Sequence, residues 1–156
     1  MNIFNLEYSK MDKAEILTHL DKMFASYYIY LHKVKMFIWN VGGRDSFDLR
    51  NEFKDIYDKS FRHMDEISER IRLFNQVPVS KLYEIIKISE IKEGDLSLTS
   101  FEMVKSLLND IIIMLSLQSD SIEKAQKLSD YGSEIMIKNL TKELEQDYFV
   151  LVSWLK

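Results

Sequence analysis

Apolar residues recur at steps of three or four along four long stretches of this chain, the spacing of one buried stripe on an α-helix. The first stretch covers residues 12–40 and the second covers 46–74. The third begins at Thr99 and reaches about Leu128, and the last runs to the end of the chain. A shorter amphipathic stretch covers 80–88. The pattern predicts four long helices with one short helix between the second and the third.

The predicted core positions are the apolar members of these stripes. Only Ser60 interrupts the second stripe. In chain order the positions are Ile16, Leu20, Met23, Tyr27, Leu31, Val34, Ile38, Leu49, Phe53, Ile56, Met64, Ile67, Ile71, Phe74, Phe101, Val104, Leu108, Ile111, Leu115, Ile137, Leu140, Leu144, Tyr148, Leu151 and Leu155.

Side chains that accept hydrogen bonds from free helix N–H groups stand near the predicted starts. Asp12 is followed by Glu15, Asp45 and Ser46 follow a glycine pair, and Ser80 precedes the short helix. Thr99 and Glu102 have the spacing of a capping box, in which each side chain bonds the other residue's backbone.

Four long amphipathic helices around one core predict an all-α four-helix bundle. The segment between the second and third helices is long enough to cross from one end of the bundle to the other, which is the ferritin-like connection. We expect a single domain over residues 12–156 and a short N-terminal extension over 1–11.

Composition narrows the class of protein further. The 156 residues include no Cys, which rules out disulfides and thiolate metal sites and fits a reducing cytoplasm. We expect no signal peptide and no membrane segment, since the longest aliphatic run is Ile111–Leu115. The net charge of −4 and the lack of a Lys-rich tail disfavour binding of DNA through a charged terminus. No Gly-rich phosphate loop or nucleophile–base pair points to a nucleotide binder or a hydrolase.

Two short motifs carry a family resemblance. One is Phe37-Ile38-Trp39-Asn40-Val41-Gly42-Gly43, and the other is Asp65-Glu66-Ile67-Ser68-Glu69-Arg70-Ile71. Together with Val77-Pro78-Val79-Ser80, Ile91-Lys92-Glu93 and Trp154, they make the chain resemble Dps, the DNA-protecting mini-ferritins of starved bacterial cells. The resemblance implies a ferritin-like bundle that assembles into a dodecameric shell.

The resemblance also implies an iron site between two-fold-related subunits, with histidines from one subunit and carboxylates from the other. Asp65 and Glu69 match the family's carboxylate ligands. The two histidine positions fall on Ile38 and Arg50, neither of which binds iron. A fixed positive charge would repel a cation by about 4 kcal/mol per unit charge at 4 Å and an effective dielectric of about 20. We therefore expect weak or absent iron binding there, with Arg50 paired to Asp65 or Glu69 of a second subunit.

Other positions carry weaker expectations from the family. Trp39 next to the site either quenches radicals or packs at a subunit contact, and packing is favoured because the adjacent ligands are missing. Asp55 is the remaining acid of an inward-facing mineral-nucleating cluster. Asp130 and Glu134 match acids that line a three-fold pore. The three histidines, His19, His32 and His63, are expected to be surface or packing residues.

An ordinary interpretation of Asp65 and Glu69 stays open beside the functional one. Charged pairs one turn apart usually form a solvated helix face, here with ion pairs between Glu66 and Arg70 and between Glu69 and Arg72. Two functions therefore remain. One is a Dps-like cage that sequesters iron and limits oxidative damage with a degenerate ferroxidase site, and the other is a shell without iron chemistry that serves assembly or DNA shielding.

Overall fold

The computed structural model describes residues 10–156, and within them it contains five helices and no strand. The long helices are α1 (Lys10–Asn40), α2 (Ser46–Leu73), α4 (Ser100–Lys127) and α5 (Tyr131–Leu155). The short helix α3 (Leu82–Ile88) lies between α2 and α4. The predicted all-α architecture with one short extra helix is confirmed.

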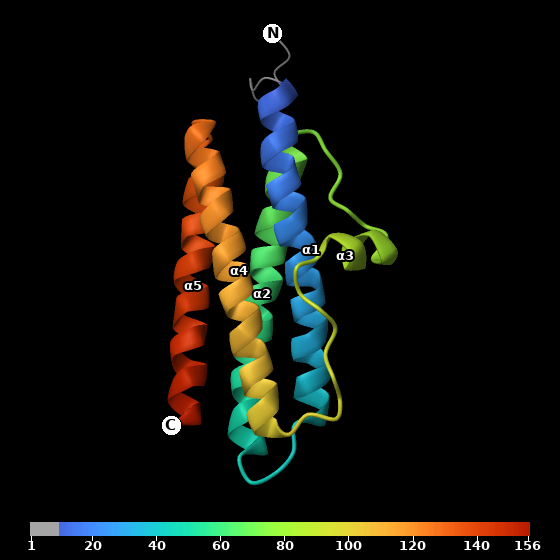
Figure 1. Cartoon of the computed structure of the whole chain (residues 1–156), viewed down its shortest axis with the longest axis vertical. Helices are drawn as coiled ribbons and strands as arrows, with labels where there is room; N and C mark the ends of the chain where they lie inside the picture. The colour runs from blue at the N-terminus through green and yellow to red at the C-terminus, as the bar shows by residue number, and fades with distance from the viewer. Residues whose placement is uncertain (1–9) are drawn as a thin grey trace.

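The four long helices stand side by side as a bundle, and α3 lies outside it against α1 (Figure 1). Helices α1 and α2 pair as one antiparallel hairpin and α4 and α5 as another. The chain leaves α2 at one end of the bundle, passes through α3 and enters α4 at the opposite end (Figure 1). This long crossover makes α2 and α4 parallel, as the sequence predicts for a ferritin-like connection.

The helix boundaries follow local signals, with three corrections. The capping box of Thr99 and Glu102 is present at the start of α4. Helix α1 already includes Lys10, so Asp12 is not its N-cap. Ser80 does not cap α3 either, since its hydroxyl donates to the carbonyl of Pro78 and the helix begins two residues later. Asp45 precedes α2 at the N-cap position, but its side chain makes no capping hydrogen bond, and Ser46 already lies in the helix. These errors come from reading a capping side chain without the backbone geometry that a cap requires.

The core contains most of the predicted stripe and differs from it at a few positions. Phe101 and Tyr148 were expected inside, but they are 47% and 36% exposed. Asp147 occupies the buried position on α5 that periodicity gives to its neighbour Tyr148. On α2, Ser60 and His63 are buried while Met64 is only half-buried. Polar side chains therefore enter the core near the middle of the bundle.

The predicted surface ion pair between Glu66 and Arg70 is also wrong. Arg70 reaches across to α5, where its guanidinium donates to Asp130 at 2.6 Å and to the Ser133 hydroxyl at 2.9 Å. Arg72 donates to the backbone carbonyl of Gln76 rather than pairing with Glu69. The contact of Arg70 fastens α2 to the start of α5. Within residues 10–156, no helix is long and apolar enough to cross a membrane.

Candidate functional site

The two family-matching carboxylates lie on the solvent side of α2. Asp65 and Glu69 are one turn apart and exposed. Neither side chain makes an ion pair or hydrogen bond with another described residue, unlike most charged groups near them. The interpretation of these carboxylates as part of a solvated helix face paired Glu69 with Arg72. The Arg72 guanidinium instead donates to the backbone carbonyl of Gln76. The carboxylates are therefore available to a ligand or to a second molecule.

Arg50 lies at the other end of α2 and is fixed against the end of α1. Its Nε donates to the carbonyl of Ile38 and its Nη2 donates to the carbonyl of Val41, both at 3.1 Å. The Ile38 carbonyl belongs to the last turn of α1 and the Val41 carbonyl follows directly after it, where backbone acceptors have no helical partner. A positive charge there also interacts favourably with the helix dipole. Three N–H groups of the guanidinium remain for other contacts.

Ile38 has the structural role that its spacing predicts. Its side chain is 5% exposed and belongs to the hydrophobic core, and the chain turns after Val41 through Gly43, whose φ of 92° suits glycine. Trp39, the next residue, is 67% exposed and points away from that core. The two positions where the family resemblance implies imidazoles thus hold a buried alkyl side chain, Ile38, and a guanidinium, Arg50, with the exposed indole of Trp39 beside them.

The two halves of the implied site are far apart within one chain. Arg50 and Asp65 are 15 residues apart on one straight helix, which is about 22 Å at 1.5 Å per residue. Over residues 10–156, no three His, Cys, Asp or Glu side chains converge closely enough to hold a metal ion. A single chain therefore does not bring these four positions together, and any site that combines them needs two copies.

An apolar groove lies between these halves on the α1–α2 face. It has a volume of about 250 Å³ and is lined by Tyr28, Leu31, His32, Lys35, Tyr57, Phe61 and Met64. Phe61 precedes Asp65 by one turn, so the carboxylates continue the α2 edge of the groove. Trp39 follows Lys35 by one turn and continues the α1 edge. The exposed aromatic residues, the groove and the carboxylates therefore share one face.

The remaining family-derived positions have different surroundings. Asp55 is exposed on α2, with Asn51 and Lys54 exposed beside it. Asp130 is 1% exposed, caps α5 through the Ser133 N–H and pairs with Arg70. Its carboxylate therefore lies inside the subunit. Glu134 is partly exposed and pairs with Lys138 at 2.6 Å, so it is the more accessible of the two acids expected at a pore.

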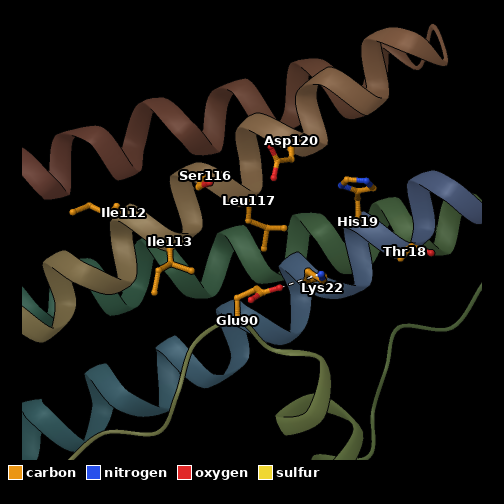
Figure 2. A pocket seen from close by; sticks show the side chains of 9 residues that line it. All are labelled: Thr18, His19, Lys22, Glu90, Ile112, Ile113, Ser116, Leu117 and Asp120. Carbon is orange, nitrogen blue, oxygen red and sulfur yellow. Dashed lines mark ion pairs between the residues drawn. The ribbon is translucent and has the colours of Figure 1, made fainter.

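A second pocket of about 440 Å³ lies between α1 and α4 under the chain that follows α3 (Figure 2). Ile112, Ile113 and Leu117 give it an apolar wall. His19 and Asp120 lie toward one end, and the ion pair of Lys22 with Glu90 lies on the other side (Figure 2). Burial lowers the pKa of His19, and the positive charge of Lys124 lowers it further. None of the expected site residues lines this pocket.

A buried polar network in the middle of the bundle was missed by periodicity. Tyr27 of α1, His63 of α2 and Gln118 of α4 are each about 1% exposed and are joined by hydrogen bonds. Thr141 of α5 donates to the Gln118 side chain at 2.8 Å, which completes a connection through all four long helices. The signal in the sequence was the break that Ser60 makes in the α2 stripe one turn before His63, although the Ser60 hydroxyl itself makes no hydrogen bond with another described residue.

Two ion pairs accompany this network in the core. Lys33 of α1 donates to Asp110 of α4 at 2.6 Å, and both side chains are less than one tenth exposed. Lys59 of α2 pairs with Asp147 of α5, whose side chain is 1% exposed. Burial raises the pKa of Asp110 and of Asp147, and the adjacent ammonium groups oppose that rise. Each long helix thus carries one member of a buried charge pair.

The helix order, the parallel α2 and α4 and the long crossover define a ferritin-like four-helix bundle. The family model of the ferritin-like domain matches residues 14–153. The chain is 30% identical over 141 residues to DNA protection during starvation protein 2 of Bacillus anthracis, covering 90% of this chain and 97% of that protein. The chain belongs to the Dps family of ferritin-like proteins.

Solved structures have the same fold. The Dps protein of Vibrio cholerae O1, described as a member of a broad superfamily of ferritin-like diiron-carboxylate proteins, superposes with a TM-score of 0.92. It is 24% identical, and the match covers 100% of this chain and 99% of that one. Dps from Staphylococcus aureus has a TM-score of 0.89 at 25% identity, with 92% and 96% of the two chains covered.

Proposed function

We propose that this protein is a Dps-type shell that sequesters iron and limits oxidative damage, but that its inter-subunit site does not oxidise iron. Family membership supports the broad function. The observation that argues against iron oxidation is the position of Arg50. Its guanidinium is held by the Ile38 and Val41 carbonyls, where the family resemblance implies a histidine. Iron(II) takes imidazole and carboxylate ligands and needs an open position for the oxidant.

The proposed arrangement follows from the geometry of α2. In a two-fold interface, residue i of one copy contacts residue j of the other, and j contacts i. Arg50 and Asp65 meet across such an axis if it passes near the middle of the segment between them, close to Tyr57. Tyr57 lines the apolar groove, so the same axis brings two grooves with their exposed aromatic edges together. An apolar centre flanked by charged pairs is typical of a stable protein interface.

In this arrangement, the guanidinium takes the place of the metal. Three of its N–H groups are free to bind the partner's carboxylates, and charge-assisted bonds of this kind are stronger than neutral ones. A cation entering the same place would meet a repulsion of about 4 kcal/mol per unit charge at 4 Å and an effective dielectric of about 20. Iron uptake would then depend on carboxylates elsewhere, such as Asp55 and Glu134.

The alternative is a shell without iron chemistry that serves assembly or shields DNA. The same Arg50 contacts favour it. The net charge of −4 disfavours contact with the phosphates of DNA.

The test measures particle mass and bound iron together. The full-length protein is loaded with iron(II) under peroxide, and its size and iron content are read by light scattering and elemental analysis. We expect a particle much larger than a dimer that retains iron, and we expect Asp65→Asn to loosen the particle while Glu66→Gln, an exposed neighbour, leaves it intact. A large particle with no retained iron would favour the alternative, and a monomer would contradict both.

A further inference from the structure

The centre of the bundle contains a chain of hydrogen bonds that leads from a buried phenol to the surface. The Tyr27 hydroxyl lies 3.2 Å from His63 Nδ1, and the two rings meet edge to face with centroids 5.5 Å apart. The other imidazole nitrogen, Nε2, lies 2.9 Å from Oε2 of Glu143. Glu143 is about one third exposed and also accepts from Arg62.

The partners fix which atom donates at each link. Glu143 Oε2 is an acceptor, so Nε2 of a neutral His63 carries the proton and Nδ1 has the free lone pair. Gln118 Nε2 donates to the Tyr27 oxygen at 2.9 Å, so the phenol's own O–H is directed to Nδ1. Burial lowers the pKa of His63, which favours the neutral ring that this arrangement needs. Tyr27 therefore faces a ready proton acceptor inside a dry core.

A second tyrosine gives an internal comparison. Tyr30 lies one turn further along α1, and both phenols are about 1% exposed or less. The Tyr30 hydroxyl makes no hydrogen bond within the part of the chain that the structure describes. Burial raises the pKa of both tyrosines far above the usual value, so neither exists as tyrosinate at neutral pH. Only Tyr27 has a base positioned to take its proton.

The charged groups around this chain of bonds come from two helices, α2 and α5. Lys59, Arg62 and Glu66 on α2 and Asp147 on α5 are the other charges that act on Tyr27, His63 or Glu143. Lys59 is paired with Asp147, so these two charges offset each other close to the phenol. The exit for a proton is Glu143, which borders a surface pocket of about 530 Å³ between α2 and α5.

We propose that Tyr27 is a redox-active tyrosine that gives one electron to strong radical oxidants while His63 takes its proton. The oxidant, such as a hydroxyl radical formed from peroxide, accepts the electron and becomes hydroxide. The O–H bond of Tyr27 breaks, its proton binds Nδ1 of His63, and the Nε2 proton of His63 passes to the Glu143 carboxylate. The product is a neutral tyrosyl radical enclosed by the bundle, where it does not reach another chain to form a cross-link.

The hydrogen-bonded base makes this oxidation feasible. Removing an electron alone would leave a cationic phenol radical in an apolar core, and an uncompensated buried charge is strongly unfavourable. Transfer of the proton to a positioned base avoids that state, and such a base typically speeds a reaction by a factor of 10² to 10⁴. The activity does not depend on iron at Asp65 and Glu69.

The test generates the oxidant without iron. The full-length protein is flash-oxidised with a ruthenium polypyridyl photosensitiser and persulfate, and the neutral tyrosyl radical is followed by transient absorption and electron paramagnetic resonance. We expect a long-lived radical in the wild type and in Tyr30→Phe, and its loss in Tyr27→Phe. With His63→Gln, the long-lived radical should form about a hundredfold more slowly, from the loss of the base.

Glu143→Gln changes only the exit of the relay at a partly exposed position, so it tests the proposal without altering the core. We expect it to slow formation of the long-lived radical. We also expect the rate to lose the part of its solvent deuterium isotope effect that comes from proton transfer between His63 Nε2 and Glu143. Equal radical yields in Tyr27→Phe and Tyr30→Phe would overturn the proposal, as would an unchanged rate in both His63→Gln and Glu143→Gln. Because no iron is present, these outcomes are separate from those that test the iron function.

Discussion

Individual polar residues in the core depend on their partners more than on their own chemistry. Lys33 and Asp110 pair at 2.6 Å, and either charge left in the core without the other would be strongly unfavourable. His63 is neutral because burial lowers its pKa, while its hydrogen bond to Glu143 opposes that change. Substitution of one partner should therefore lower the free energy of unfolding more than substitution of both partners.

For the buried pair, we predict that Lys33→Met lowers the free energy of unfolding by about 3–5 kcal/mol, because Asp110 is left buried without its counter-charge. The double substitution Lys33→Met with Asp110→Leu should recover most of that loss. Urea unfolding followed by circular dichroism measures both values. A double variant that is less stable than the single one would show that the pair itself stabilises the fold.

For His63, we predict that stability decreases as the pH falls below the usual histidine value of 6.5. The pKa is lowered in the folded state, so between the two pKa values the unfolded chain binds more protons, and acid favours unfolding. His63→Gln should make this part of the curve flatter. The free energy of unfolding of both proteins, measured between pH 7.5 and pH 5 in buffers of roughly equal ionic strength, tests this. Parallel curves would assign the pH dependence to other groups.

At the level of helices, the sequence predicts the elements well and their contacts poorly. Helical periodicity and the capping box of Thr99 depend on neighbours a few residues away, so one sequence is enough to find them. The partner of Arg70 lies 60 residues further along the chain, and nothing local indicates that it prefers Asp130 to Glu66. The burial of Asp147 in place of Tyr148 has the same origin, since Lys59 on another helix stabilises it.

The contact of Arg70 gives a prediction at this level. A Cβ at Gly132 would lie 2.7 Å from the Arg70 guanidinium, so Gly132→Ala must displace a group held by Asp130 and Ser133. We expect a loss of about 1–3 kcal/mol, the usual effect of a buried charged hydrogen bond that is broken. Gly42→Ala is the control, because a Cβ there meets nothing within 4 Å. Thermal unfolding should separate the two variants clearly.

For the whole molecule, the site positions implied by the family resemblance can form one site only when two copies of the chain associate. Asp65, Glu69 and Arg50 could be located from the motif alone, but their separation of about 22 Å in one chain follows from helix geometry. The groove lined by Tyr57 and Phe61 could not be predicted, because its depth depends on how α1 and α2 pack. The hydrogen bonds of Arg50 to the end of α1 also appear only in the folded chain.

The proposed pairing of Arg50 with Asp65 across a two-fold axis predicts the result of a charge swap. Arg50→Glu and Asp65→Arg should each weaken the dimer, because like charges then face each other at two places in the interface. The double variant should regain much of the affinity with the charges reversed. Sedimentation at several protein concentrations measures the dissociation constants. Single variants that associate as tightly as the wild type would exclude this pairing.

The most direct test of the central claim is the rate of iron(II) oxidation by peroxide, compared between the wild type and the variant Ile38→His with Arg50→His. Light scattering first confirms that both proteins assemble, because Ile38 is buried and its replacement disturbs the core. We predict that the wild type oxidises iron no faster than Asp65→Asn with Glu69→Gln, and that the double-histidine variant oxidises it faster. Rapid oxidation by the wild type that disappears when Asp65 and Glu69 are replaced would contradict the account.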